Sequence, residues 1–144
     1  MTPPDAPGLI AAARDVLRPH RVGGRVMGDV AAVLETPTGQ RFAGVHIDTA
    51  CGTGACAEHA AVAAMVTAGQ YRIAAITAVW RDGDGRLVVL PPCGRCREFL
   101  RQVDPGNLDT AVVLGPDRVV PLRDLLPAHV WPAPLDEELL TPGG

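Results

Sequence analysis

Four residues in two short segments have the types and the spacing of a metal centre. The segment ACAEHAA contains Cys56 and Glu58, and the segment PPCGRCREF contains Cys93 and Cys96. Two cysteines in a Cys-x-x-Cys turn can both bind one ion, as zinc-ligand pairs commonly do. With Cys56 as a third ligand, the fourth tetrahedral position stays open for water, as in catalytic zinc sites. We therefore expect a catalytic Zn²⁺ bound by Cys56, Cys93 and Cys96.

An acidic side chain accompanies the first of these cysteines. Glu58 follows Cys56 by two positions, near the start of a predicted helix. A carboxylate there can take a proton from a bound water molecule and return it to a leaving group, so Glu58 is the candidate catalytic residue. Two other interpretations of the Cys-x-x-Cys remain open, a redox dithiol and half of a structural zinc site. The fourth cysteine, Cys51, is expected to be a buried thiol or part of the pocket wall.

The hydrophobic pattern predicts the elements that must position these residues. Helices are predicted over residues 9–17, 55–68 and from the Cys-x-x-Cys turn to about 103, with a short helix near the end of the domain. Strands are predicted over residues 29–36, 41–48, 72–80, 86–90 and 110–115. This order predicts an α/β fold, a three-layer α/β/α sandwich with a mixed five-stranded sheet.

The chain divides into one predicted domain and two ends. Residues 9–131 form the domain, and the proline-rich residues 1–8 are expected to be a flexible N-terminal arm. Residues 132–144 are predicted to be a C-terminal tail. We favour a frayed end for this tail, although its leucines could dock a short helix on a neighbouring molecule.

Length, charge and hydropathy restrict the function classes. A chain of 144 residues can bury the core of one domain. A net charge of −3 argues against nucleic-acid polymers as the main partner. No apolar run approaches the roughly 20 residues of a membrane helix, and no signal peptide opens the chain. We expect a cytoplasmic protein with no membrane partner, in which closely spaced cysteines bind metal or react.

The motifs CAE at 56–58 and PCGRC at 92–96 resemble those of the cytidine deaminase superfamily of zinc enzymes. The resemblance extends from about Val22 to Trp131, and PCGRCREFL with LRDLLPAHVW is most similar in wording to blasticidin S deaminases. A cysteine in place of the histidine of His-x-Glu is similar to enzymes that act on free nucleosides, which are usually homotetramers. The resemblance thus implies a cytidine-deaminase-like fold, a Zn²⁺ cofactor, and a homotetramer or homodimer.

The implied reaction is the hydrolytic deamination of a free cytosine-type nucleoside, cytidine or deoxycytidine, to the uracil form with release of ammonia. Water attacks C4 of the ring, and Glu58 protonates N3 and assists the departure of ammonia. One alternative is deamination of a modified cytosine nucleoside such as blasticidin S. An alternative from a different class is a non-catalytic, zinc-stabilised binding protein with a deaminase fold.

The resemblance also implies roles for residues around the zinc site. Arg95, inside the Cys-x-x-Cys loop, is expected to donate to the cysteine sulfurs and to offset the negative charge of three thiolates. Nucleoside deaminases often have an arginine directly after CAE, whereas this chain has His59. Arg97 is a second candidate for the compensating cation.

Substrate contacts are implied less directly. His46 and Asp48 occupy a segment where cytidine deaminases carry the Asn-Val-Glu that holds the ribose, so we expect both to contact the sugar. The alternative for this pair is a hydrogen bond that pins the loop. The backbone around Ala55 and Pro91 is expected to orient the reacting amino group.

One position departs clearly from the family. Gly28 stands where cytidine deaminases usually have the phenylalanine that stacks on the base. Either a neighbour such as Met27 replaces that ring, or the pocket is more open and suits a bulkier cytosine nucleoside. The aromatic Trp131 near the end of the domain is expected to pack at an interface rather than to stack on substrate.

Overall fold

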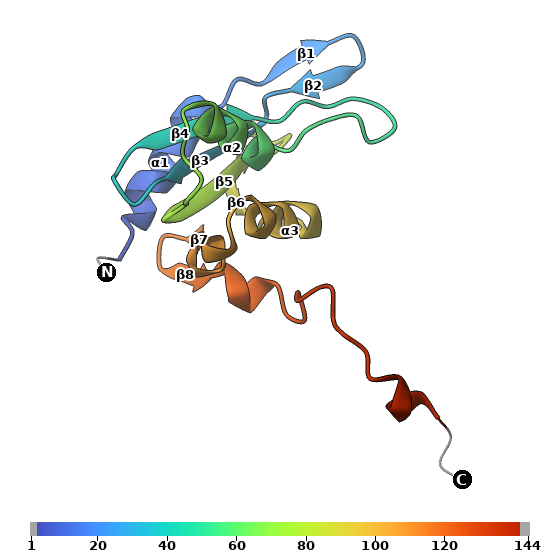
Figure 1. Ribbon diagram of the computed structural model, residues 1–144. Helices are drawn as coiled ribbons and strands as arrows, with labels where there is room; N and C mark the ends of the chain where they lie inside the picture. Colours follow the sequence, from blue (N-terminus) through green and yellow to red (C-terminus); the bar gives the residue numbers. More distant parts are fainter. Residues whose placement is uncertain (1–2, 142–144) are drawn as a thin grey trace.

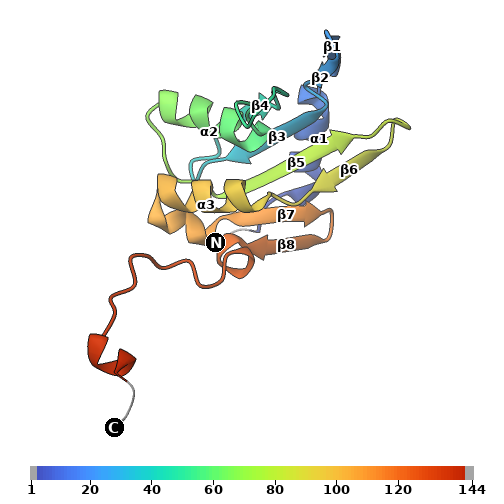
Figure 2. The same ribbon diagram turned by 90° about the vertical axis from the view of Figure 1, so that its right-hand side faces the viewer.

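The computed structural model describes residues 3–141 and is built around one mixed sheet (Figures 1 and 2). The strands run in the order β4–β3–β5–β7–β8, and β6 also pairs with β5. β5 and β7 are parallel, and the other neighbouring strands are antiparallel. The strand bounds are β3 (Val30–Glu35), β4 (Arg41–Val45), β5 (Ala75–Arg81), β6 (Leu87–Leu90), β7 (Ala111–Gly115) and β8 (Arg118–Pro121). The predicted mixed sheet is therefore confirmed.

One edge of strand β5 pairs with two different strands. Its segment Ala78–Arg81 pairs with β6, whereas Ala75 and Ile76 pair with β7. Thr77 lies where the partner changes, and its hydroxyl donates a hydrogen bond to the Val113 carbonyl at 3.2 Å. The sheet therefore has six strands, of which β6 and β7 share one edge of β5. The sequence pattern did not predict the sixth strand, β8.

Helices cover both faces of this sheet. Helix α1 (Ala6–Val16) packs on one face, and helices α2 (Ala57–Thr67) and α3 (Gly94–Val103) pack on the other (Figure 2). Alternate side chains of each strand enter the two resulting cores, as the period of two residues in a strand requires. Val33, Val79 and Val113 face α1, while Leu34 and Ile76 face α2 and α3. The predicted α/β/α layering is confirmed.

Helix α2 lies unusually close to β4 because small residues meet at the contact. A Cβ atom on Gly44 would lie 2.4 Å from the Ala60 Cβ and 2.5 Å from the Ala61 nitrogen. Neither distance is possible for a real side chain, so glycine is required at this point. The close approach fixes the height at which α2, and with it Cys56 and Glu58, stands above the sheet.

Three further segments complete the domain. Strands β1 (His20–Val22) and β2 (Arg25–Met27) form a separate hairpin that projects from the body (Figures 1 and 2). The 3₁₀ helices η1 (Pro105–Asp109) and η2 (Leu122–Leu125) flank β7 and β8. Within residues 3–141, no helix is both long enough and apolar enough to span a membrane.

The N-terminal arm is shorter than predicted, because helix α1 begins at Ala6. Asp5 is the N-cap, and its Oδ1 accepts a hydrogen bond from the Gly8 N–H at 3.0 Å. Pro7 lies in the first turn, where a missing N–H costs nothing and the fixed φ suits the helix. The prolines that suggested a loose arm therefore mark a helix start, and the prediction was wrong for residues 6–8.

The C-terminal tail extends away from the domain (Figures 1 and 2). It contains the short 3₁₀ helix η3 (Glu137–Leu140), and all described residues from Trp131 onward are exposed. Leu135, Leu139 and Leu140 are 68%, 80% and 63% exposed. Residues 132–141 of the single chain therefore bury little apolar surface against the domain.

Removal of residues 132–144 is expected to leave the Tm within about 3 °C of that of the full chain. Exposed residues that bury nothing typically change stability by less than about 0.5 kcal/mol. Thermal unfolding of the two proteins, followed by circular dichroism at several protein concentrations, measures the effect. A loss of more than about 5 °C, especially one that depends on concentration, would show that the tail packs on a second molecule.

Candidate metal centre and active site

Two helices begin at the two cysteine segments. Cys56 is the N-cap residue of α2 and Cys93 is the N-cap residue of α3, both with extended backbone conformations. Cys96 lies in the first turn of α3 and is fully buried. The positive ends of both helix dipoles are thus directed at the sulfur atoms, an environment that stabilises thiolates.

The sulfur atoms of Cys56, Cys93 and Cys96 lie within 4.8 Å of one another. None of the three forms a disulfide. In a tetrahedral site with Zn–S bonds of about 2.3 Å, sulfur atoms lie about 3.8 Å apart. Three converging thiols at this separation suit one zinc ion, so the donor set fits the metal predicted from the sequence.

Glu58 stands directly beside this sulfur cluster. It is the second residue of α2 and is only 6% exposed. Its Oε2 lies 3.6 Å from the Cys96 Sγ. Burial raises the pKa of Glu58, which favours the form that holds a proton. The carboxyl group is therefore placed to receive and to release a proton within a site shielded from solvent.

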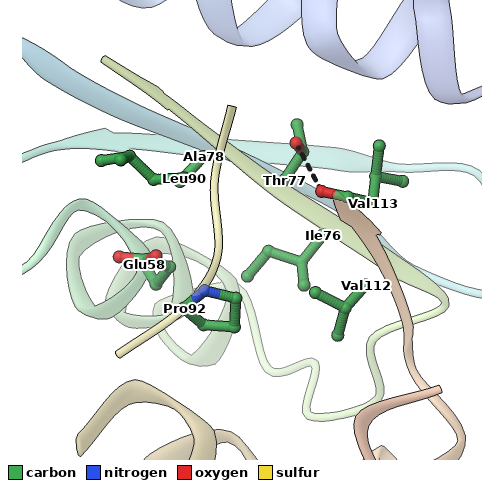
Figure 3. Close-up of a pocket in the computed structure, with 8 residues that line it drawn as sticks. All are labelled: Glu58, Ile76, Thr77, Ala78, Leu90, Pro92, Val112 and Val113. Atoms are coloured by element: carbon green, nitrogen blue, oxygen red, sulfur yellow. Dashed lines mark hydrogen bonds between the residues drawn. The ribbon is translucent and has the colours of Figure 1, made fainter. Parts of the chain in front are cut away.

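A small cavity adjoins the Glu58 side chain at the point where β5 changes partners. Figure 3 shows Glu58 on one side of it and side chains of the sheet on the other. The residues that line it come from α2, from the three strands β5, β6 and β7, and from the segment before α3: Glu58, Ile76, Thr77, Ala78, Leu90, Pro92, Val112 and Val113. Apart from Glu58 and Thr77, this lining is apolar.

The electrostatics of the cluster call for a cation. Burial raises the pKa of Cys96, and the neighbouring Glu58 carboxylate raises it further. Burial also raises the pKa of Cys93, but hydrogen bonds from the backbone N–H groups of Cys96 and Arg95 and from the Cys96 and Cys56 thiols together lower it by more. A carboxylate and three thiolates cannot remain ionised together in a buried place without positive charge nearby. A divalent ion bound by the three sulfurs would supply that charge.

The predicted substrate segment is tied to the metal centre by backbone hydrogen bonds. The N–H of Ile47 donates to the Ala55 carbonyl at 2.9 Å, and the Ala55 N–H donates to the Ile47 carbonyl at 3.1 Å. This bridge joins the segment of His46 and Asp48 to the residue before Cys56. Because the Ala55 N–H is used in the bridge and the Ala55 carbonyl already accepts one hydrogen bond there, only the second lone pair of that carbonyl remains for a substrate amino group. Pro91 lies exposed before α3.

His46 and Asp48 make different contacts. The His46 Nδ1 lies 2.9 Å from the Asp29 Oδ1. The Asp48 N–H lies 3.2 Å from the Met27 Sδ. Within residues 3–141, the side chain of Asp48 has no hydrogen-bond partner, so its carboxylate is available to a ligand.

The three candidate cations near the site differ in their contacts. Arg95 is exposed in a shallow hollow beside Glu98, and in the described part of the chain no hydrogen bond joins it to a cysteine sulfur. Burial lowers the pKa of His59, and the charge of Arg95 lowers it further. The His59 ring packs against Phe99 with centroids 4.1 Å apart and the ring planes tilted by 44°. His59 therefore acts as a neutral packing residue.

Arg97 connects the metal-binding loop to the rest of the domain. Its Nε donates to the Pro92 carbonyl at 2.8 Å, and its Nη1 donates to the Leu125 carbonyl at 3.0 Å. These two bonds hold the loop that carries Cys93 against η2. Arg97 is thus a clamp on the loop rather than a charge directed at the sulfurs.

Arg97→Ala is expected to lower the free energy of unfolding by about 1–3 kcal/mol, because two carbonyl groups lose a charged donor. Arg118→Ala is the matched control, since Arg118 is exposed, lies away from the metal-binding loop and should change stability by less than about 0.5 kcal/mol. Urea unfolding of both zinc-loaded variants measures the difference. Equal losses in the two proteins would contradict the assignment of Arg97 as the clamp.

The backbone at Gly28 decides whether a side chain could take the place of the missing phenylalanine. Gly28 has φ +69°, and a Cβ atom on it would lie 2.3 Å from the Arg18 carbonyl oxygen. No side chain can therefore replace the missing phenylalanine at this position.

Cys51 is exposed and lies outside the sulfur cluster, so the expectation of a buried thiol was wrong. Its φ of 59° places it in the turn that precedes Gly54.

Comparison with known proteins agrees with this geometry. Residues 15–112 match the family model of the cytidine and deoxycytidylate deaminase zinc-binding region. The chain therefore belongs to this deaminase family, and the resemblance found in the sequence is confirmed.

Individual relatives lie within the same superfamily. The chain is 35% identical over 66 residues to a cytidine deaminase of Proteus mirabilis (strain HI4320), covering 43% of this chain and 22% of that protein. It is also 35% identical over 81 residues to a blasticidin-S deaminase of Bacillus cereus, covering 53% of this chain and 58% of that protein. The crystal structure of cytidine deaminase from Burkholderia pseudomallei superposes with a TM-score of 0.68 at 30% identity, covering 85% of this chain and 97% of that one.

Proposed function

We propose that the protein is a zinc-dependent hydrolytic deaminase that converts a free cytosine-type nucleoside, cytidine or deoxycytidine, to the uracil form and releases ammonia. One observation carries this proposal. A buried carboxyl group, Glu58, stands 3.6 Å from one of three cysteine sulfurs that converge on a single point. A structural zinc site has no use for a carboxylate in that position, whereas a hydrolytic site requires one.

Cys56, Cys93 and Cys96 would hold the zinc ion. When bound, zinc lowers the pKa of a water molecule so that it can attack carbon at neutral pH. Glu58 receives the proton of that water and delivers it to N3 of the ring as the C4–O bond forms. Glu58 then moves the proton of the new C4 hydroxyl group to the amino group, the C4–N bond breaks, and ammonia leaves as the C4 carbonyl forms. Because Glu58 is buried, these transfers take place in a site shielded from bulk solvent.

Charge compensation comes from the protein around the cluster. Three thiolates and a divalent ion carry a net charge of −1. The first turns of α2 and α3 place backbone N–H groups beside Cys56 and Cys93, which offsets this charge. Arg95, in the first turn of α3, acts through space as a further positive charge rather than through a hydrogen bond to sulfur.

The remainder of the substrate occupies the edge of the sheet near β4. Asp48 offers a carboxylate and His46 an imidazole to the sugar hydroxyl groups. The Ala55 carbonyl and the backbone at Pro91 orient the amino group that is lost. We assign the protein to the cytoplasm as a homotetramer or homodimer, in line with its resemblance to nucleoside deaminases.

Deamination of blasticidin S is the second candidate. The 35% identity to a blasticidin-S deaminase over 81 residues favours it, as does the absence of a side chain at Gly28. A substrate larger than cytidine could occupy the space where other members carry a phenylalanine.

Ammonia release from a panel of cytidine, deoxycytidine, cytosine and blasticidin S tests the proposal. The zinc-loaded protein is expected to deaminate at least one nucleoside of the panel, and the ratio of kcat/KM values identifies the substrate. A protein that contains zinc but releases no ammonia from any member would instead be the non-catalytic, zinc-stabilised binding protein.

A further inference from the structure

The Asp29 carboxylate contacts two side chains that the proposed chemistry does not use together. The Asp29 Oδ1 lies 2.9 Å from the His46 Nδ1. The Trp80 indole N–H donates to the Asp29 Oδ2 at 3.3 Å. These residues come from the start of β3, the end of β4 and the end of β5. Asp29 therefore fixes the positions of both an imidazole and an indole.

This trio lies on the face of the sheet that carries Glu58. Trp80 pairs with Val30, and Val30 packs into the core beneath α2 and α3. Ala78, two residues before Trp80, lines the cavity at Glu58 (Figure 3). Side chains two residues apart on a strand point to the same face and lie about 6.6 Å apart. Trp80 is thus one strand repeat from the cavity, on the same face.

Trp80 is the aromatic side chain best placed to meet a bound molecule. Phe42 packs against the core, and Phe99 packs against the His59 ring. Tyr71 lies before β5 begins, at the opposite end of the strand from Trp80, and Trp131 contacts Glu98 at the start of the tail. Trp80, in contrast, is 36% exposed while its ring edge is fixed by Asp29. A restrained indole with a free surface is a typical surface for stacking on a planar or sugar ring.

The geometry of Asp29 also sets the orientation of His46. The His46 Nδ1 faces the Asp29 carboxylate. The Nε2 of the same ring has no hydrogen-bond partner in the part of the chain that the structure describes. Nε2 is then the ring nitrogen that remains for a hydroxyl group of a ligand.

We infer that Trp80, held by Asp29, is the wall on which the substrate's ring system stacks, and that Asp29 is a positioning residue for both Trp80 and His46. The inference rests on the proposed deaminase function and adds two residues to it. It also accounts for Gly28, which stands where cytidine deaminases usually have a stacking phenylalanine, because Trp80 of β5 supplies the aromatic ring instead.

Steady-state kinetics with cytidine, or with whichever nucleoside the panel selects, test the inference. Trp80→Ala is expected to raise KM about 10-fold or more, because stacking on an aromatic side chain is typically worth that much per base. The value of kcat should change less than about 3-fold, since Trp80 does not touch the reacting atoms. Trp80→Phe should restore most of the affinity. Asp29→Asn should raise KM with little effect on kcat.

Tyr71→Ala is the matched control for loss of an exposed ring. Tyr71 is 51% exposed but lies at the other end of β5, so its removal should leave KM unchanged. An unchanged KM in Trp80→Ala would overturn the inference. So would a change of oligomeric state in Trp80→Ala, measured by light scattering, that accounts for the whole kinetic effect.

A binding measurement without turnover separates this inference from the proposed function. The chain has two tryptophans, so Trp131→Phe leaves Trp80 as the only one. In a Glu58→Gln, Trp131→Phe protein, cytidine and uridine are expected to change the Trp80 fluorescence in a saturable manner. A signal without any ammonia release by the wild type would support the stacking surface and contradict the deaminase. Ammonia release without a signal would support the deaminase and overturn the stacking surface.

Discussion

Glu58→Gln is expected to abolish deamination while zinc content and Tm stay close to those of the wild type. The amide matches the carboxyl group in shape and can occupy the same buried position, but it cannot carry a proton. General acid–base assistance is worth roughly 10²–10⁴-fold, and here one group serves attack, ring protonation and leaving-group departure. The loss of kcat should therefore lie at or above the upper end of that range. Ammonia release, measured beside zinc content, gives the result.

A Glu→Gln substitution in an exposed ion pair is the control. Glu35 pairs with Arg41 on the strand edge at 2.8 Å, so Glu35→Gln should retain nearly full turnover. Substrate affinity of Glu58→Gln should fall far less than its kcat, because the amide still forms hydrogen bonds in the pocket. A Glu58→Gln protein with full zinc and more than about a tenth of wild-type turnover would show that Glu58 does not transfer the protons.

Loss of any one sulfur from the cluster is expected to remove the metal and much of the stability. Wild-type protein should bind close to one zinc per chain, since three thiolates converge on one position. Cys96→Ala and Cys93→Ala should each lose zinc, and the free energy of unfolding should fall by several kcal/mol because metal binding and folding are coupled. Zinc analysis by mass spectrometry and thermal unfolding measure the two effects.

Cys51→Ala is the matched control, because Cys51 is exposed and outside the cluster. It should keep its zinc and its Tm. A chelator should lower the Tm of the wild type and of Cys51→Ala, but not that of Cys96→Ala. Retention of a full equivalent of zinc by Cys96→Ala would reject the assignment of the ligands.

The parts of the site that could be predicted from the sequence are those held in local motifs. Cys93 and Cys96 are three residues apart at a helix start, and Cys56 and Glu58 are two apart at another. Such spacing fixes the relative position of side chains through the helix geometry alone. The five predicted strands are likewise recognisable as apolar runs bounded by turns. Each of them is present in the structure within a few residues of its predicted bounds.

The features that the sequence did not reveal depend on contacts between distant residues. The hydrogen bond from Trp80 to Asp29 joins positions 51 residues apart, and no spacing rule indicates it. Strand β8 is short and lies at the edge of the sheet. None of its residues is fully buried, so the sequence there shows no alternation of buried and exposed residues. The start of α1 was obscured because a proline serves equally well in a loose arm and in a first helical turn.

The division of β5 between two partner strands has a consequence for how such a protein can diverge. The half of β5 that pairs with β7 contributes Ile76 to the cavity beside Glu58, while the half that pairs with β6 runs from Ala78, in that cavity, to Trp80. Lineages can lengthen, shorten or replace the β5–β6 turn and the residues beside it without disturbing the inherited acid–base apparatus. Selection for a new nucleoside or antibiotic can therefore act on one half of a single strand while the other half stays fixed.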